Sequence, residues 1–231
     1  MAERILSIEL AACAERCRNM DAPLSERLAA FAGDVRRLKP DFADVVERLI
    51  ERLRAAGAGS EAPGLGQPMP EFLLPDEQGK LHALRDFLRL GPVVVAFHRG
   101  HWCPYCRINV SALAEAYPSV KRCGAELVAI TPEVEKFNAE LKIVSGAPFP
   151  VLSDMDNSYA MMLNLAFYVG DEKKRHMAAA GWDITPFNAS DAWTLPIPAT
   201  FVVGRDGLVK ARYIDPDYRK RMNVEDILAA I

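Results

Sequence analysis

The most constraining feature of this sequence is a short apolar run that leads directly into a pair of cysteines. The run, residues 93–97 (Val-Val-Val-Ala-Phe), is rich in β-branched residues and predicts a buried central strand. After a short turn, residues 103–106 (Cys-Pro-Tyr-Cys) open a segment with helical spacing. Proline suits the first turn of a helix, where its missing N–H breaks no hydrogen bond. A strand, a turn and a helix in this order predict an α/β fold with both cysteines at the junction.

The position of Cys103 favours a reactive thiol. Unpaired backbone N–H groups and the positive end of the helix dipole stabilise a thiolate at a helix N-terminus. A free thiol with a pKa of ~8.5 is only a few per cent ionised at neutral pH, whereas a pKa of ~7 gives about half. His98, Arg99 and His101 add cationic or hydrogen-bond donor groups nearby. Cys106 follows one turn later, within reach of a disulfide, so we expect Cys103 to attack and Cys106 to resolve.

The other cysteines, Cys13, Cys17 and Cys123, leave two further interpretations open. A single C-x-x-C is half of a zinc site, and Cys13 and Cys17 would complete four ligands; no second C-x-x-C or H-x-x-x-H pair supports this. The pair could also be purely structural. We expect no metal and no cofactor, and predict that Cys13, Cys17 and Cys123 pack in the core.

Composition excludes several classes of protein. The 28 basic and 31 acidic residues are intermixed and give a net charge of −3, so no basic surface for nucleic acid is expected. No segment approaches the ~18 apolar residues of a membrane helix. Charges recur from the N-terminus onward, which argues against a secretory signal. An odd number of cysteines without such a signal predicts a reducing, cytoplasmic location.

Residues 1–56 are predicted to form a helical extension. Leu6, Leu10, Cys13 and Cys17 follow the spacing of one amphipathic helix. Two further helices are predicted over 24–38 and 41–56. Three amphipathic helices can pack on the main domain, on each other or on a second subunit, so a homodimer is one expectation.

Residues 57–70 are rich in glycine and proline and predict a linker. From residue 71 to 231 strands alternate with helices, which predicts an α/β sandwich. Residues 166–195 have no clean period and predict an insertion, in which the charged run 171–176 is expected to face solvent. The predicted strands, beyond 93–97, are 72–74, 81–83, 127–130, 149–152, 200–203 and 208–213.

The segment 97–106 (Phe-His-Arg-Gly-His-Trp-Cys-Pro-Tyr-Cys) resembles the active-site segment of the thioredoxin superfamily. It is most similar to the peroxiredoxin-like branch of the alkyl hydroperoxide reductase and thiol-specific antioxidant family. Three further segments carry the resemblance in the family's order: 66–72 (Gly-Gln-Pro-Met-Pro-Glu-Phe), 149–154 (Phe-Pro-Val-Leu-Ser-Asp) and 196–203 (Pro-Ile-Pro-Ala-Thr-Phe-Val-Val). The resemblance implies a thioredoxin-like sandwich, a central mixed β-sheet flanked by helices, over 71–231.

The same resemblance assigns supporting residues. It implies that Pro198 forms a cis peptide bond beside Cys103, and that Ile197 offers backbone hydrogen bonds to a bound thiol or peptide. The alternative from the sequence alone is an ordinary trans proline at a strand start. Trp102 is expected to shield the thiolate and Trp193 to cover the site; core packing is the alternative for each.

The sequence also departs from the family pattern P-x-x-x-T-x-x-C, in which the threonine and a distant arginine bind the peroxide oxygens. Ala96 stands at the proline position, Gly100 at the threonine position, and Pro198 where the arginine is usual. In a peroxidase, Arg99, His98 or His101 would have to supply the missing donors.

Three functions fit the sequence. The first is a thiol peroxidase that reduces hydrogen peroxide or alkyl hydroperoxides through a Cys103 sulfenic acid resolved by Cys106, with a thioredoxin-like or glutathione-linked reductant. The second is a thiol–disulfide oxidoreductase that uses the same cysteines on protein disulfides. The third is a redox-sensing or interaction module without catalysis.

Overall fold

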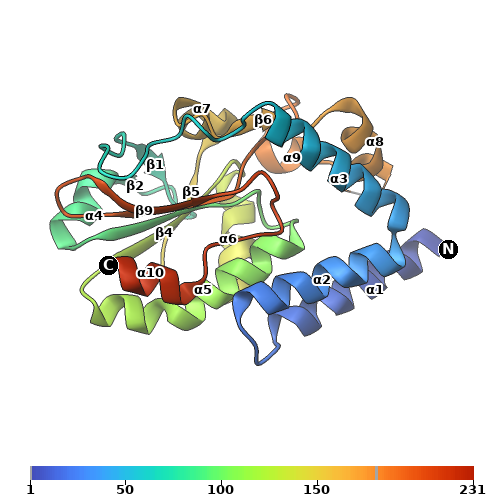
Figure 1. Ribbon diagram of the computed structural model, residues 1–231, viewed down its shortest axis with the longest axis horizontal. Coiled ribbons are helices and arrows are strands. Elements are labelled where there is room, and N and C mark those ends of the chain that lie inside the picture. The colour runs from blue at the N-terminus through green and yellow to red at the C-terminus, as the bar shows by residue number, and fades with distance from the viewer. Residues whose placement is uncertain (1, 180–181) are drawn as a thin grey trace.

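A computed structural model describes residues 2–179 and 182–231 of the chain (Figure 1). The side chain of Leu6, and Ala180 and Gly181 of the predicted insertion, lie outside the described part. The helices are α1 (Ala2–Arg18), α2 (Leu24–Leu38), α3 (Pro40–Ala55), α4 (Leu84–Leu90), α5 (Pro104–Arg122), α6 (Glu135–Ser145), η1 (Met155–Asn157), α7 (Ser158–Met162), α8 (Asp171–Ala179), α9 (Thr185–Asn188) and α10 (Val224–Ala230). The strands are β1 (Leu73–Pro75), β2 (Leu81–Ala83), β3 (Val93–Phe97), β4 (Glu126–Thr131), β5 (Val151–Ser153), β6 (Ala166–Tyr168), β7 (Thr194–Pro196), β8 (Ala199–Val203) and β9 (Val209–Ile214).

A five-stranded mixed sheet in the order β5-β4-β3-β8-β9 forms the centre of the fold. β3 pairs in parallel with β4 and antiparallel with β8. The predicted strand 93–97 is therefore the middle strand, and all five of its residues are buried, as its continuous apolar sequence requires. Because β3 is the middle strand, the turn that follows it lies at the centre of the sheet, where the strands end.

Helices cover both faces of this sheet, which is the predicted thioredoxin-like sandwich. Alternate β3 residues point to opposite faces. Val94 and Ala96 pack with side chains of α5, α6 and α10. Val93, Val95 and Phe97 pack with α4, α7 and the β1–β2 hairpin. Figure 1 shows α5 and α10 on one side of the sheet, with α7 and the hairpin on the other.

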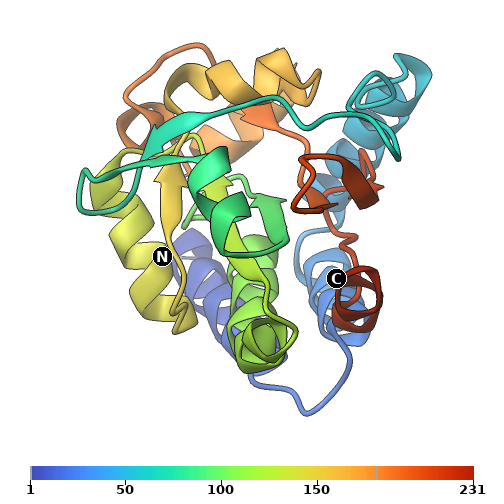
Figure 2. The same cartoon turned by 90° about the vertical axis from the view of Figure 1, so that its left-hand side faces the viewer.

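The predicted N-terminal helices lie against the rest of the chain. Figures 1 and 2 both show α1 and α2 beside α5. The rings of Phe31 on α2 and Tyr105 on α5 pack in a T-shaped arrangement with their centres 4.9 Å apart. Arg27 forms a bidentate ion pair with Glu115, with N–O distances of 2.9 and 2.8 Å. The division at residues 56 and 70 stays a prediction, but side chains from both sides of it share one buried cluster.

Two segments without clear periodicity are more ordered than their sequences suggest. The predicted linker 57–70 runs along the β8–β9 turn, where Gly66 and Met69 donate backbone hydrogen bonds to Val209 and Gly207 at 2.9 Å each. The predicted insertion contains α8 and α9, and its ends pair as the antiparallel strands β6 and β7. Neither pairing leaves a pattern in the sequence, because each depends on contacts between distant segments.

Candidate active site

Cys103 and Cys106 lie at the junction of β3 and α5. Cys103 is the N-cap of α5 and Pro104 its first helical residue. The Cys103 carbonyl accepts the first helical hydrogen bonds, from the N–H groups of Cys106 at 3.0 Å and Arg107 at 3.1 Å. Both cysteines are free thiols with no exposed surface.

Two arginines lie against the cysteine pair. Arg99 Nη2 donates to Cys103 Sγ at 3.4 Å, and Arg221 Nη2 donates to Cys106 Sγ at 3.7 Å. Burial alone would raise the pKa of Cys103, but the hydrogen bond from the Cys106 thiol and the charges of Arg99 and Arg221 hold it well below its ordinary value. Cys103 is therefore the thiolate of the pair.

Cys106 has the opposite electrostatic character. Burial and the neighbouring Cys103 thiolate raise the pKa of Cys106 well above its ordinary value. The backbone N–H of Arg99 also donates to Cys106 Sγ at 3.3 Å. The site thus holds one ionised sulfur and one protonated sulfur a helical turn apart.

Aromatic rings fix the position of Arg99. Its guanidinium carbon lies 3.6 Å from the centre of the Tyr218 ring and 4.9 Å from that of Trp102. The Cys103 thiolate and Tyr218 outweigh burial and raise the pKa of Arg99, so the guanidinium stays charged although only 4% of the residue is exposed. Trp102 therefore packs on the arginine that contacts Cys103.

His98 is not the cation that the sequence allowed. The residue is fully buried, and burial together with the charge of Arg221 lowers the pKa of its imidazole to about 3. The ring is therefore neutral at physiological pH, and neither of its nitrogens has a hydrogen-bond partner within the described part of the chain. Burial decides its charge, and burial could not be deduced from the position of His98 in the turn.

His101 pairs with the buried carboxylate of Glu133. Its backbone N–H and Nδ1 lie 2.6 and 2.7 Å from the two carboxylate oxygens of Glu133, and its ring stacks on Phe137 at 4.8 Å. Burial outweighs these contacts and raises the pKa of Glu133. Gly100 has φ of +131°, and a Cβ there would lie 2.5 Å from the Glu133 carboxyl carbon. The close carboxylate therefore requires glycine at this position.

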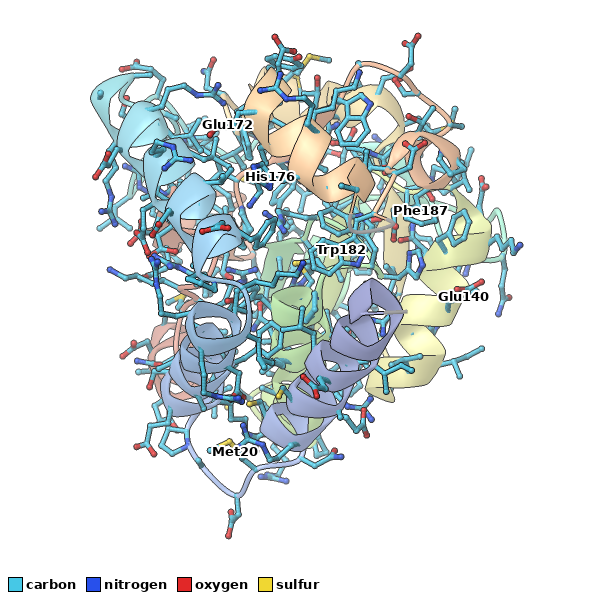
Figure 3. All side chains as sticks on the ribbon, turned by 90° about the vertical axis from the view of Figure 1, so that its right-hand side faces the viewer. Met20, Glu140, Glu172, His176, Trp182 and Phe187 are labelled. Carbon is cyan, nitrogen blue, oxygen red and sulfur yellow. The ribbon has the colours of Figure 1, made fainter. Side chains whose placement is uncertain are left out.

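Two neighbouring hollows with shared lining residues lie beside the start of α5. The outer cavity, about 260 Å³, lies between α1, the start of α5 and Trp182. The inner cleft, about 30 Å³, shares Leu10, Trp102 and Trp182 with it and reaches Arg99. In Figure 3, Trp182 lies between α8 and α1. Apolar side chains of α1, α2 and α3 line one part of the inner cleft, so the N-terminal helices form one of its walls.

The thiol pair at a helix start, on the central strand of a thioredoxin-like sheet, can be compared with known proteins. The model of the AhpC/TSA family matches residues 65–212, more than half of the chain. The chain belongs to the AhpC/TSA family.

Individual relatives of this AhpC/TSA protein fall into two groups. The thiol-disulfide oxidoreductase ResA of Geobacillus thermodenitrificans is 28% identical over 151 residues, covering 64% of this chain and 68% of that protein. A chloroplastic peroxiredoxin Q of Oryza sativa subsp. japonica is 33% identical over 92 residues, covering 40% of this chain and 42% of the relative. The crystal structure of peroxidoxin BcpB from Mycobacterium tuberculosis superposes with a TM-score of 0.57 at 20% identity, over 73% of this chain and 96% of that one. This last likeness shows the shared fold.

The family match leaves part of the site outside its bounds. Tyr218 and Arg221 follow residue 212, and the N-terminal helices that line part of the inner cleft precede residue 65. Sequence reasoning missed Arg221, Tyr218 and Lys173. The basic run 219–221 (Arg-Lys-Arg) was the only signal for Arg221, and Lys173 belongs to the run that was expected to face solvent. That expectation is wrong for Lys173, which is 3% exposed.

The expected cis bond at Pro198 is wrong, because the Ile197–Pro198 peptide is trans. The Ile197 N–H donates to the Leu165 carbonyl at 2.7 Å, which extends the β6–β7 pairing. This N–H is therefore already occupied and unavailable to a bound thiol or peptide. Both residues are buried beside the start of β8, and their roles in catalysis stay predictions.

The remaining cysteines and tryptophans have mixed outcomes. Cys17 is fully buried and Cys13 half-buried against the same cluster, as expected. Cys123 is exposed, so the prediction of core packing is wrong; it is the C-cap of α5, where the helix leaves the sheet. Trp193 is buried and lies in the main core cluster. Among the described residues no cluster of histidine, cysteine and carboxylate side chains could hold a metal ion, and no helix is long and apolar enough to cross a membrane.

Proposed function

We propose that this AhpC/TSA protein is a thiol peroxidase in which Cys103 attacks the hydroperoxide. The observation that supports this best is the contact between the Arg99 guanidinium and Cys103 Sγ, 3.4 Å apart at the buried N-terminus of α5. The arginine keeps the sulfur ionised and offers N–H donors beside it, where the O–O bond would break. Arg99 and Arg221 would thus take the place of the threonine and arginine of the family pattern, which this chain lacks.

In the first step, the Cys103 thiolate attacks the terminal oxygen of the hydroperoxide. The S–O bond forms as the O–O bond breaks, giving a Cys103 sulfenic acid and an alkoxide or hydroxide, which takes up a proton to become an alcohol or water. In the second step, the Cys106 sulfur attacks this sulfenic acid and the thiol proton leaves with the hydroxyl as water, so a Cys103–Cys106 disulfide forms. Cys106 suits this step because it is kept protonated, and so unoxidised, until Cys103 has reacted.

A thiol reductant must then supply two electrons to restore the two thiols. We propose a thioredoxin-like or glutathione-linked donor, acting by thiol–disulfide exchange. All five cysteines are free thiols, a state that suits a reducing compartment such as the cytoplasm. A homodimer remains an expectation from the amphipathic N-terminal helices, and size-exclusion chromatography with light scattering tests it.

The decisive experiment measures hydroperoxide consumption coupled to a thioredoxin system. Wild type should turn over, and Cys103→Ser should not. Cys106→Ser should react once with peroxide, accumulate a sulfenic acid that dimedone traps, and turn over only with small monothiols. Cys123→Ser is the matched control because this exposed thiol lies at the far end of the same helix. Turnover that survives in Cys103→Ser would reject the proposal.

A second candidate, a thiol–disulfide oxidoreductase, is favoured by the C-x-x-C motif and by the relative that carries this activity. Two features weigh against it. Cys103 is fully buried, and the Ile197 N–H that would bind a peptide is occupied. Insulin reduction faster than peroxide reduction at equal protein concentration would favour this second function.

A further inference from the structure

Lys173 of α8 is buried beside the candidate site without a carboxylate partner. Only 3% of the residue is exposed, and within the described residues it forms no salt bridge. Its Nζ lies 4.2 Å from the centre of the Phe42 ring and donates to the Tyr218 hydroxyl at 3.2 Å. An unpaired buried ammonium is costly, so its retention here calls for a functional reason.

Lys173 and Tyr218 both line the inner cleft. Arg99, the residue that contacts Cys103, lines the cleft with them. The Tyr218 hydroxyl accepts from Lys173 and keeps its own hydrogen for another acceptor. Arg99 connects this pair to the reacting sulfur, because its guanidinium stacks on the Tyr218 ring at 3.6 Å and donates to Cys103 Sγ at 3.4 Å.

We propose that Tyr218 and Lys173 form a proton relay that protonates the oxygen leaving the hydroperoxide, so both act as general acids in the peroxidase step. The inference rests on the proposed peroxidase function. When the Cys103 thiolate takes the terminal OH group, the O–O bonding electrons go to the other oxygen as an alkoxide or hydroxide. The Tyr218 hydroxyl donates a proton to this oxygen and takes one from the Lys173 ammonium. The products are a sulfenic acid, a neutral alcohol or water, and a neutral lysine, which solvent reprotonates.

The surrounding charges suit this timing. Burial and the positive charges of Arg99 and Arg219 lower the pKa of Lys173 well below its ordinary value, whereas the Cys103 thiolate raises it. Among these groups the Cys103 thiolate is the one that favours the charged form of Lys173. Oxidation converts the thiolate into a neutral sulfenic acid, so the proton is released in the step that consumes the negative charge.

The test compares leaving groups of different basicity. Alkyl hydroperoxides release a strongly basic alkoxide that needs a proton, whereas a peroxycarboxylic acid releases a weakly basic carboxylate that does not. We would measure second-order rate constants for wild type, Lys173→Met and Tyr218→Phe with tert-butyl hydroperoxide and with peracetic acid. Lys174→Met is the matched control, because it removes the same charge from the next residue of α8, outside the cleft. Circular dichroism and thermal unfolding check that each variant is folded, and Tyr218→Phe preserves the packing if Lys173→Met does not fold.

We expect both relay variants to lose about 10²-fold or more of the rate with tert-butyl hydroperoxide, the range of general acid catalysis, and about tenfold or less with peracetic acid. In both variants, the rate of Cys103 alkylation by iodoacetamide should decrease far less than the rate with tert-butyl hydroperoxide. Equal decreases of the rate constants with both oxidants and with iodoacetamide would mean that Lys173 acts only through an electrostatic effect on the thiolate. This result would overturn the proton relay but not the peroxidase function. A wild-type protein with no Cys103-dependent reaction toward either oxidant would overturn the peroxidase function as well.

Discussion

The Arg99→Gln variant tests the electrostatic basis of the site. The guanidinium nitrogen lies 3.4 Å from Cys103 Sγ, and both groups are buried. At that distance, with an effective dielectric constant of about 20, the attraction between the guanidinium and a thiolate is about 5 kcal/mol. Arg221 and the Cys106 thiol remain in the variant and recover part of this energy. A net loss of only a third, about 1.6 kcal/mol, still lowers the ratio of thiolate to thiol at least about tenfold.

The sign of the effect follows from the charge. Removing a cation raises the pKa of the Cys103 thiol, so the rate of alkylation by iodoacetamide should level off at a higher pH than in wild type. Mass spectrometry of the peptide that contains Cys103 separates this reaction from those of the other cysteines. At pH values below the plateau of wild type, the alkylation rate should be about tenfold or more lower than in wild type, and the peroxide rate should decrease with it.

Arg89→Gln is the matched control, because it removes the same charge from an exposed ion pair with Asp86, whose contribution is small. Its alkylation profile should coincide with that of wild type. An Arg99→Gln profile that also coincides with wild type, in a protein with unchanged circular dichroism, would refute the assignment of Arg99 as the group that keeps Cys103 ionised.

Three further variants test the packing around the site, each by urea denaturation. Gly100→Ala should lower the free energy of unfolding by about 2–4 kcal/mol, because its Cβ meets the Glu133 carboxylate at a positive φ; an unchanged midpoint would contradict the geometry. Phe31→Ala should cost about 3–5 kcal/mol, since the ring is 2% exposed and packs edge-on against Tyr105; a loss under about 1 kcal/mol would mean that α2 is not docked there. Burial would raise the pKa of Asp217, but the hydrogen bond and charge of Arg219 outweigh burial and lower it. The ionised carboxylate therefore stabilises the folded protein, and this stability is lost as the pH falls below about 4. Asp217→Asn should therefore destabilise the protein more at about pH 7 than at about pH 3, and an equal effect at both values would contradict the sign.

The sequence predicted those parts of the site that depend on local spacing. The β-branched run and the C-x-x-C motif specify a strand–turn–helix junction within a few residues, and this placed Cys103 and Cys106 correctly. The charges around them depend on tertiary contacts. Burial makes His98 neutral, and Arg221 reaches Cys106 from a position 115 residues later in the chain. No periodic pattern marks such a contact, because it depends on how distant segments dock.

The same limit explains the other errors. The charged run 171–176 was expected to be solvated because charges usually are. Its third residue, Lys173, is instead covered by Phe42 of α3 and Tyr218, both distant in sequence. The segments 57–70 and 166–195 were predicted as linker and insertion because strand pairing over a long separation leaves no local period.

The contact between Arg221 and Cys106 has a consequence for the newly made protein. During synthesis, Cys103 and Cys106 leave the ribosome long before Arg221 and Tyr218 have been translated. Until those later residues dock, the nascent chain lacks one of its two arginines and the aromatic ring that steadies the other. We therefore expect Cys103 to reach its full thiolate character only when this late segment has docked beside the cysteines.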